Sequence, residues 1–393
     1  MVEEKSKGPL NGLVVMDVSI MAAGPWTAAL LGMLGAEVIK IEPPDGDGTR
    51  WVEPTQNGMG TNFISMNVNK KDMTLDLKHP GDNETARKLA SKCDIFVQNF
   101  RVGVIERLGL DYETLRKINP RIIYCAISGF GEVGPLAKTG CADSIMQAFS
   151  GFASLNGAPY EELEAFRFTG FLDLTTAGIA TEAVLAALVE RETTGLGQKV
   201  EVSMLEAALE IQGTRVSQYL GAHQVPPTLG SGSALLAPDQ AFATLDVEIF
   251  VTAHNEEQWR GVCDALGLSE IAEDPLFGSN LLRVNNRDLL VAILGPVFKT
   301  RPSLWWLRAL RRRDVPCSIA HTFETFRDHA QIIDNGMIAG LETHWGKVNV
   351  AGLPWHFLGT PCEVMPPPIP GENTAEIRSL LAQTSLPSGE VIA

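Results

Sequence analysis

The sequence of 393 residues predicts an α/β protein with a large domain built on a doubly wound parallel sheet and a smaller second domain. In the first half, short runs of β-branched residues alternate with helical stretches, which is the pattern of parallel strands joined by crossover helices. After Ala222, the Pro- and Gly-containing stretch 224–238 indicates a linker, and a different pattern follows it. The length suffices for two domains, and 45% hydrophobic with 20% charged residues is typical of a globular enzyme.

The N-terminal elements alternate as this fold requires. Residues 12–18 and 37–42 are apolar and β-branched and predict two buried strands. The helix predicted between them, 25–34, carries Pro25 in its first turn, where proline is tolerated. Residues 73–77 predict the next strand of the same sheet.

The following segments continue this alternation. A helix is predicted from about Pro80, a strand over 94–98, a helix over 111–118 and a strand over 121–127. A long helix over 173–192 comes next, and its many small residues predict close packing on its neighbours.

A short strand and a capped helix end the first half. Residues 200–202 predict the strand. Ser203 with Glu206 three positions later forms a capping box, which opens a helix that runs towards Leu220.

The second half indicates a smaller α+β domain. Residues 240–253 predict a hairpin or meander. Helices are predicted near 256–266, 285–298 and 302–312. The tail from about residue 328 carries scattered strand signals and ends in a helix near 374–382.

Charge and cysteine usage exclude several classes of protein. The net charge of −15 disfavours nucleic acid and anionic membranes as partners. No two of the six cysteines lie within four residues, which excludes a zinc knuckle and a C-x-x-C pair and fits a reducing cytosol. The seven histidines lack metal-ligand spacing, residues 1–10 lack a signal peptide, and no apolar run reaches the roughly 18 to 20 residues of a membrane span. We therefore expect a cytoplasmic protein without a metal.

One glycine-rich motif allows two interpretations. Gly129, Gly131 and Gly134 form G-x-G-x-x-G straight after a predicted strand, which is the spacing of a dinucleotide site. Pro135 follows at once, and no helix N-terminus is predicted there to face a pyrophosphate. We interpret the motif as a loop of turn-forming glycines and expect no NAD.

Asp173, at the start of the long small-residue helix, has two possible roles. An aspartate there is usually a helix cap, which stabilises by about 1 kcal/mol. The same position suits a nucleophile, because the helix dipole favours the ionised carboxylate that attack on a thioester requires. The residue and its position alone favour the cap.

Several ordered motifs span nearly the whole chain. They are VMD at 15–17, AGP at 23–25, LGAEVIKIE at 34–42, LDLK at 75–78, VQNF at 97–100, ISGFGEVGP at 127–135, RETTGLGQKVEVSM at 191–204 and VPC at 315–317. In this order and spacing they resemble the family III CoA-transferases, which include formyl-CoA:oxalate, crotonobetaine/carnitine and benzylsuccinate CoA-transferases.

The resemblance implies a Rossmann-like large domain with a parallel sheet, a smaller α+β domain, and an interlocked dimer. It also implies that both ends of the chain build the large domain. We therefore expect residues 1–222 to form its N-terminal part, 223–327 to form the small domain with its linker, and 328–393 to return and complete the large domain.

The resemblance also implies the reaction. The catalytic aspartate of the family matches Asp173, which makes the nucleophile the preferred role. An acyl-CoA and a free carboxylic acid would exchange coenzyme A through an aspartyl anhydride and an aspartyl-CoA thioester on Asp173.

Residues that contact CoA follow from the same resemblance, position by position. The predicted CoA-binding residues are Met21, Ala22, Ala23, Leu75, Lys78, Asn99, Phe100, Arg107 and Asp143, the last of which matches an acidic position near the site. The Lys78 and Arg107 cations would offset the CoA phosphates. Pro43 stands where some members carry arginine, so one phosphate contact differs here. Residues 230–233 are a candidate for the glycine-rich loop that covers the site in some members.

Two alternatives stay within the same resemblance. The α-methylacyl-CoA racemases share the fold but carry a histidine at the position of Ala142, and neither Ala142 nor Cys141 replaces an imidazole in proton transfer. The second alternative is one subunit of a heteromeric CoA-transferase. The intact Asp173 favours an active chain, and a homodimer is the preferred assembly.

Overall fold

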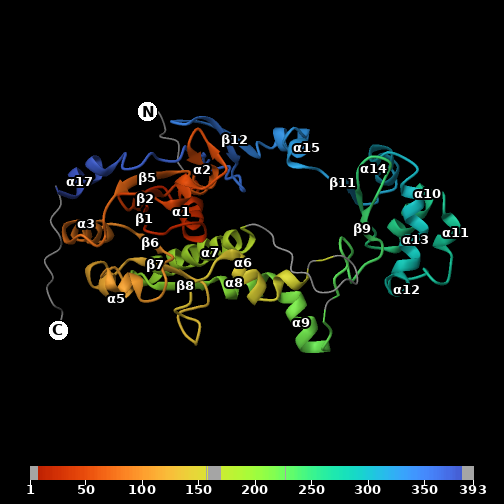
Figure 1. Cartoon of the computed structure of the whole chain (residues 1–393), viewed down its shortest axis with the longest axis horizontal. Coiled ribbons are helices and arrows are strands. Elements are labelled where there is room, and N and C mark those ends of the chain that lie inside the picture. Colours follow the sequence, from red (N-terminus) through yellow and green to blue (C-terminus); the bar gives the residue numbers. More distant parts are fainter. Residues whose placement is uncertain (1–7, 156, 158–169, 226, 383–393) are drawn as a thin grey trace. The chain divides into compact units, whose positions relative to one another are not determined.

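The computed structural model describes residues 8–155, 157, 170–225 and 227–382, and the chain divides into two compact units. The larger unit comprises Met1–Ser150, Arg167–Gly213 and Ala330–Ala393, and the smaller comprises Gly151–Phe166 and Thr214–His329. The chain therefore passes from the larger unit into the smaller one twice and returns each time (Figure 1).

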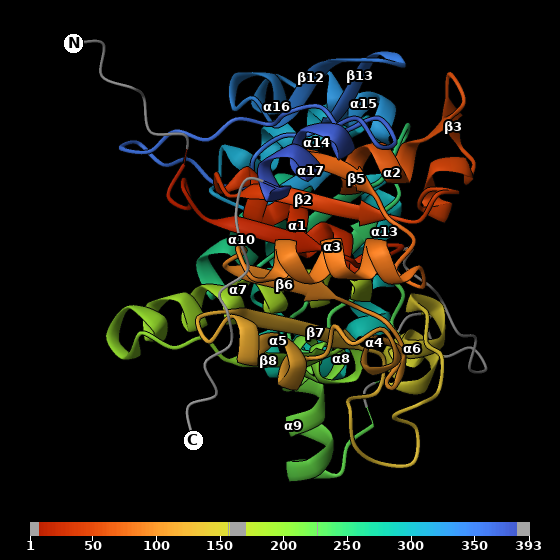
Figure 2. The same cartoon turned by 90° about the vertical axis from the view of Figure 1, so that its left-hand side faces the viewer.

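A sheet of six parallel strands organises the larger unit (Figure 2). In spatial order its strands are β5 (Lys70–Thr74), β2 (Glu37–Glu42), β1 (Val14–Asp17), β6 (Ile95–Gln98), β7 (Ile123–Ser128) and β8 (Lys199–Ser203). All neighbouring strands run parallel, and Val15 lies opposite Val38 on one side and Ile95 on the other. The predicted parallel α/β fold is confirmed.

The strand order reverses at the centre of this sheet. From β1 the chain adds β2 and β5 on one side, and then crosses to β6, β7 and β8 on the other. The loops after β1 and β6 therefore leave in opposite directions and open a crevice at the carboxyl ends of the strands. Open α/β sheets bind their ligands at such a point.

Helices cover both faces of the sheet. The larger unit contains α1 (Ala23–Met33), α2 (Thr61–Met66), α3 (Pro80–Ala90), α4 (Val104–Arg107), α5 (Tyr112–Ile118), α6 (Asp143–Phe149), α7 (Phe171–Thr194), α8 (Met204–Ile211), α16 (Ala330–Asp334) and α17 (Thr374–Ala382). On one face, Ala28 of α1 and Ala180 of α7 share a core with the strands. On the other, Leu89 of α3, Leu115 of α5 and Ile377 of α17 build a second core. The small residues of α7 let it pack against α1, as its sequence predicts.

Helix α7 is also long and apolar enough, by length and composition, to cross a membrane. In this fold it covers the parallel sheet, with Leu172, Ala177 and Val184 fully buried. Its apolar composition is therefore that of a core helix.

Short elements complete the larger unit around the sheet. They are η1 (Gly48–Trp51), β3 (Thr55–Gln56), β4 (Met59–Gly60), and the hairpin of β12 (Ile338–Thr343) and β13 (Gly346–Ala351).

The smaller unit packs helices around an antiparallel sheet. Its strands are β9 (Asp239–Phe242), β10 (Ile249–Thr252) and β11 (Cys317–Ile319), with β10 in the middle. Its helical elements are η2 (Phe152–Leu155), α10 (Glu256–Leu266), α11 (Ser269–Ala272), α12 (Asn280–Asn285), α13 (Arg287–Phe298), α14 (Ser303–Arg311) and α15 (Phe323–Arg327), and α9 (Gly213–Ala222) begins at its boundary. Trp259, Phe298 and Trp306 fill its core, and the predicted α+β class is confirmed.

The returning C-terminal segment covers the outer edge of strand β5. The backbone N–H of Asp72 donates to Asn373 Oδ1 at 3.1 Å, and Asn373 N–H returns a bond to the Asp72 carbonyl at 3.0 Å. Thr374 Oγ1 accepts from Thr74 N–H at 3.0 Å. Helix α17 then packs on the sheet through Ile377, so this edge is closed by residues about 300 positions later.

Buried ion pairs lie at the six-stranded sheet, at positions where apolar side chains are expected. Lys70 Nζ lies 2.8 Å from Asp17 Oδ2, with both side chains fully buried. Arg50 donates from Nε and Nη2 to the two oxygens of Glu42 at 2.8 Å each. Such pairs need complete hydrogen bonding to offset the cost of dehydrating the charges. These charges also explain a wrong strand boundary, since β5 begins at Lys70 and ends at Thr74, three residues before the predicted segment.

Asp72 lies in the same cluster and gives stability a defined pH dependence. Burial raises the pKa of Asp72 to about 8, assisted by the hydrogen bond and charge of Glu42. The folded state therefore holds a proton that the unfolded chain releases near pH 4, so stability falls as pH rises from about 4 to about 8. We expect Asp72→Asn, which is neutral throughout, to gain stability over the wild type across this window, by at most about 1.4 kcal/mol per pH unit. Thermal unfolding at pH 5 and pH 8.5 measures the difference.

Asp82 provides the matched control with the opposite sign. Its carboxylate accepts from Arg378 Nη2 at 2.6 Å, and this bond lowers the pKa of Asp82. The stability from that bond is present above the ordinary pKa and is lost as pH falls. Asp82→Asn should therefore lose stability relative to the wild type as pH rises, whereas parallel unfolding curves for wild type and Asp72→Asn would contradict the proposed role of Asp72.

Candidate active site

A cavity of about 1150 Å³ opens at the carboxyl ends of β1, β2, β5 and β6, on the side of α3 and α4. Its wall includes Val18 and Ile20 after β1, Pro43 after β2, and Phe100 after β6. Leu75, Lys78, Phe100 and Arg107, four of the predicted CoA-binding residues, line it together. The point where the strand order reverses therefore carries a cavity that is large enough for a cofactor-sized ligand.

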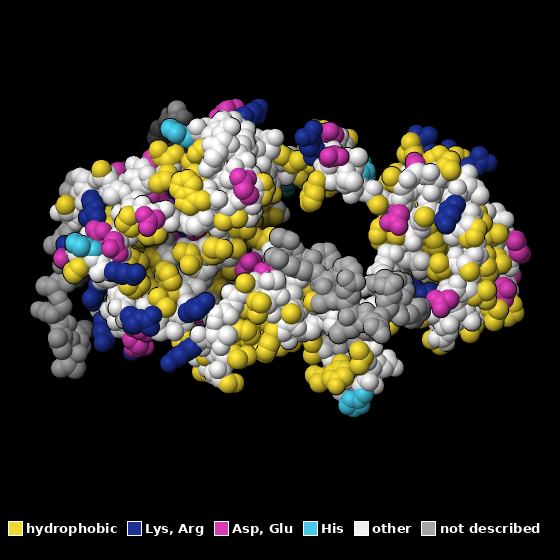
Figure 3. Space-filling model, viewed as in Figure 1, with side chains coloured by type: hydrophobic (Ala, Val, Ile, Leu, Met, Phe, Trp, Pro, Cys, Tyr) yellow, Lys and Arg dark blue, Asp and Glu magenta, His cyan; other side chains and the backbone are white. Residues whose placement is uncertain are grey.

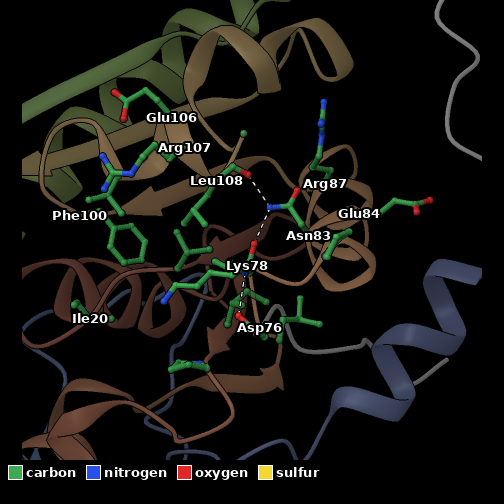
Figure 4. Close-up of a pocket in the computed structure, with 18 of the residues that line it drawn as sticks. Ile20, Asp76, Lys78, Asn83, Glu84, Arg87, Phe100, Glu106, Arg107 and Leu108 are labelled. Atoms are coloured by element: carbon green, nitrogen blue, oxygen red, sulfur yellow. Dashed lines mark hydrogen bonds between the residues drawn. The ribbon is translucent and has the colours of Figure 1, made fainter.

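The cavity combines apolar walls with basic side chains. In Figure 4, Lys78 extends to the side where Phe100 and Ile20 lie, while Glu84 and Arg87 of α3 point away from the centre. Asn83 donates to the carbonyls of Leu77 and Leu108 at 3.0 and 2.7 Å, and thereby joins the loops on both sides of the cavity. Lys and Arg side chains are interspersed with apolar ones over the larger unit at the left of Figure 3. An anionic ligand thus finds local cations despite the net charge of −15.

Asn99 fixes the loop that separates this cavity from α1. Its side chain accepts from Ile20 N–H at 2.9 Å and donates to the Ile20 carbonyl at 2.7 Å. Met21 follows with a left-handed φ of 67°, and α1 begins at Ala23. Met21, Ala22, Ala23 and Asn99 therefore lie at the reversal point, but they are not among the residues that line the cavity.

Two buried lysines hold this loop and the first turn of α1. Lys40 Nζ donates to the Ser19 carbonyl at 3.1 Å, and Lys70 Nζ donates to the Pro25 carbonyl at 2.8 Å. Burial lowers the pKa of Lys70 to about 8. The loop before α1 and the first turn of that helix are therefore held by two lysines that lie outside them, Lys40 in β2 and Lys70 in β5.

Asp173 lies in the first turn of α7, half-buried and at the same end of the sheet. Helices α1 and α7 are neighbours, and Thr27 Oγ1 donates to the Ala177 carbonyl at 3.5 Å. The start of α7 therefore lies beside the start of α1, into which the cavity loop leads. This arrangement brings Asp173 to the carboxyl end of the sheet with the predicted CoA-binding residues.

The structure decides against Asp173 as the local cap of α7. The cap position is Gly170, with a left-handed φ of 70°, and Asp173 is the third residue of the helix. The N–H groups of Leu172 and Asp173 instead donate to Asp143 of α6, at 2.7 and 3.2 Å. Asp143, which the resemblance places among the CoA contacts, therefore has its carboxylate against the start of α7.

Cys141 lies close to both carboxylates. Burial raises the pKa of its thiol, and the negative charges of Asp173 and Asp143 contribute in the same direction. The thiol is therefore kept protonated and is a poor nucleophile beside Asp173.

The glycine motif forms turns, as predicted. Gly131 and Gly134 have left-handed φ angles of 88° and 95°, and the next helix, α6, begins only at Asp143. Because no helix N-terminus follows the glycines, the motif lacks the geometry of a dinucleotide site. Over the described parts of the chain, no group of three or more His, Cys, Asp or Glu side chains could hold a metal ion.

Sequence reasoning missed several residues of this site. Asn83 and Ile20 belong to the cavity, and Gln147 bonds Asp143 within α6. A signal existed for Gln147, because it follows Asp143 by one helical turn. No local signal identifies the contact between Asp143 and α7, since the two segments are about 30 residues apart.

Comparison with known proteins gives a consistent result over nearly the full length. The sequence model described as CoA-transferase family III matches residues 10–374. The succinyl-CoA:glutarate CoA-transferase of Mus musculus is 33% identical over 95% of this chain and 86% of its own, and the acetyl-CoA:oxalate CoA-transferase of Acetobacter aceti is 35% identical over 79% and 80%. A crystal structure of a CAIB/BAIF family protein from Brucella suis superposes with a TM-score of 0.86 at 30% identity, covering 95% of this chain and 100% of that one.

Proposed function

Because the chain belongs to CoA-transferase family III and is a CoA-transferase, we propose that Asp173 is the nucleophile that carries the acyl and CoA groups in turn. The observation that carries this proposal is the position of Asp173, in the first turn of α7 at the ligand-binding end of the sheet. The N–H groups of Leu172 and Asp173 donate to Asp143, and the start of α7 offers partial positive charge to an anion.

The proposed reaction exchanges the two groups on one carboxylate. Asp173 attacks the carbonyl of the acyl-CoA, which forms an aspartyl anhydride and releases the CoA thiolate. The thiolate attacks the aspartyl carbonyl, which gives an aspartyl-CoA thioester and frees the donor acid. The acceptor carboxylate then attacks this thioester, which forms a second aspartyl anhydride and releases the CoA thiolate again. The thiolate attacks the acceptor's carbonyl in that anhydride, which gives the new acyl-CoA and frees the Asp173 carboxylate. Every bond broken is matched by one formed, without a redox step or a metal.

The cavity is proposed to hold the coenzyme A part of the substrate. Lys78 and Arg107 supply cations for its phosphates, and Phe100 and Ile20 supply apolar surface. From there the thiol end would pass over the loop of Met21, Ala22 and Ala23 towards Asp173.

The named relatives suggest the class of acid. The two described above act on succinyl-CoA with glutarate and on acetyl-CoA with oxalate, by their names. We propose a small dicarboxylic acid as the acceptor and an acyl-CoA such as succinyl-CoA as the donor, in a cytoplasmic homodimer that needs neither metal nor NAD.

A racemase is less well supported. Ala142, which stands where the racemases carry histidine, is the residue before α6 and has no ionisable group. Cys141 cannot serve in its place, because its thiol is held protonated.

Covalent labelling tests the proposed mechanism. The wild-type protein is incubated with succinyl-CoA without an acceptor, trapped with hydroxylamine or borohydride, and digested for mass spectrometry. The modification should fall on the peptide that contains Asp173. Modification of another residue, or turnover without any covalent intermediate, would remove Asp173 as the carrier.

A lysine variant tests the proposed CoA cavity. Lys78→Met keeps most of the apolar side chain but removes a charge-assisted bond to phosphate, so we expect the KM for acyl-CoA to rise about tenfold at nearly unchanged kcat. Arg87→Met is the matched control, because Arg87 belongs to the same cavity wall but points away from its centre (Figure 4). Equal KM values for the two variants would place the phosphates elsewhere.

A further inference from the structure

The carboxylate of Asp143 joins two helices at the start of α7. Its Oδ1 accepts from Leu172 N–H at 2.7 Å and from Asp173 N–H at 3.2 Å, while its Oδ2 accepts from Gln147 Nε2 at 2.6 Å. The Asp143 residue is only 5% exposed. Both oxygens of a buried carboxylate are thus engaged by the protein, and one bond comes from the backbone of Asp173 itself.

The start of α7 needs such an acceptor. The first N–H groups of any α-helix lack partners within the helix, and an exposed end would leave them to water. Gly170, the residue at the cap position, has no side chain to offer, and Leu174 N–H makes a helical bond, 3.1 Å long, to the Gly170 carbonyl. Asp143 therefore replaces a local cap with one that belongs to another helix.

The acceptor is itself held in place. Gln147 lies one turn later on α6, is 1% exposed, and fixes the second carboxylate oxygen. Around them Met146 of α6, Leu172 of α7 and Met204 of α8 form a small apolar core. Because a buried carboxylate must keep its donors, Asp143 cannot turn away from α7 without a large cost in free energy.

We infer that Asp143 is a positioning residue for Asp173, and that its bonds to the first turn of α7 set the direction from which the Asp173 carboxylate approaches the thioester. This inference rests on the proposed role of Asp173 as nucleophile. The carboxylate of Asp173 is attached to a backbone unit that Asp143 holds directly. A displacement of the reacting atoms by about 1 Å can cost about a hundredfold in rate.

Substitutions at Asp143 distinguish an effect on the positioning of Asp173 from an effect on overall stability. In Asp143→Ala, two N–H groups lose their acceptor, and we expect kcat to fall about a hundredfold while the KM for acyl-CoA changes less than about threefold. In Asp143→Asn, the amide oxygen keeps accepting from α7, and a rotated Gln147 amide accepts from the new NH2 group. Because asparagine caps helices about as well as aspartate, kcat should stay within about fivefold of the wild type.

Asp111→Ala is the matched control. Asp111 caps α5 by accepting from Thr114 N–H at 3.0 Å, in the same unit and with the same residue type. It should lower the unfolding temperature to a similar extent as Asp143→Ala and leave kcat unchanged. Equal kcat losses in these two alanine variants, or an Asn variant as slow as the Ala variant, would overturn the positioning role.

Two further measurements keep the test decisive. If Asp143→Ala does not fold, Gln147→Ala serves instead: it removes the support of Oδ2, and kcat should fall at least about fivefold at unchanged KM, whereas a wild-type kcat would overturn the inference. The rate at which succinyl-CoA labels Asp173 in a single turnover should fall in parallel with kcat. Absence of label in the wild type contradicts the proposed function, whereas wild-type labelling with an equally fast Asp143→Ala variant contradicts only the positioning role.

Discussion

Asp173→Asn should lose at least about a thousandfold in kcat, because a carboxamide is too weak a nucleophile to open a thioester and covalent transfer has no substitute route. Asp173→Ala should be equally inactive. Both variants should stay folded with nearly the wild-type unfolding temperature, since Asp143 accepts from the N–H groups of Leu172 and Asp173 at the start of α7 and is present in both variants. Steady-state kinetics with succinyl-CoA and a dicarboxylic acid, together with thermal unfolding, measure both effects.

Glu190→Gln is the control for this comparison. It makes the same acid-to-amide change on the exposed side of the same helix, at the far end of α7 from Asp173. It should retain full activity. Near-normal turnover by Asp173→Asn, or equal activity losses in the two amide variants, would reject Asp173 as the nucleophile.

The largest loss of stability is expected from Lys70→Met. The ammonium group of Lys70 lies 2.8 Å from Asp17 Oδ2 and 2.9 Å from Asn67 Oδ1, in a fully buried position. Although burial acts to raise the pKa of Asp17, Lys70 and Lys40 hold it below its ordinary value. Removal of Lys70 deprives the buried Asp17 carboxylate of its nearest cation and leaves Lys40 alone to offset its charge, and the removal of one partner of a buried pair costs about 3 to 5 kcal/mol. Urea unfolding measures the change.

The neighbouring lysine offers a control of identical chemistry. Lys71 pairs with Glu37 and Glu376 at the surface, with 37% of its side chain exposed, so Lys71→Met should cost at most about 1 kcal/mol. Adding Asp17→Asn to Lys70→Met should recover part of the loss, because the buried negative charge is then absent. A Lys70→Met variant as stable as Lys71→Met would show that the buried pair contributes little.

Local sequence patterns predicted the elements whose structural signal lies within their own residues. Strand β2 and helix α10 have the predicted limits, and the capping box of Ser203 and Glu206 is present at the start of α8. In each case the signal lies within the segment, as a run of β-branched apolar residues in β2 or as a cap and its partner three positions later in α8.

Long-range contacts account for what local patterns could not predict. Lys70 and Asp72 lie outside the strand predicted over 73–77, yet they belong to β5, where Asp17 pairs with Lys70 and where Glu42 and Gly371 interact with Asp72. The helix predicted to run towards Leu220 is interrupted at Gln212, so α8 and α9 are separate. Likewise, the family resemblance predicted a role for Asp173, but only the folded chain shows that Asp143 of α6 accepts from the N–H groups in the first turn of α7.

The C-terminal segment that closes the edge of β5 also determines when the sheet can be finished during synthesis. All six strands leave the ribosome before Thr214–His329, the longer segment of the smaller unit, and Asn373 and Thr374 follow only after that segment has been made. Until then the outer N–H and C=O groups of β5 are a template for pairing with any other extended chain. The nascent protein therefore carries an open edge throughout translation of the inserted unit, and the length of that insertion sets the time during which chaperones must shield it.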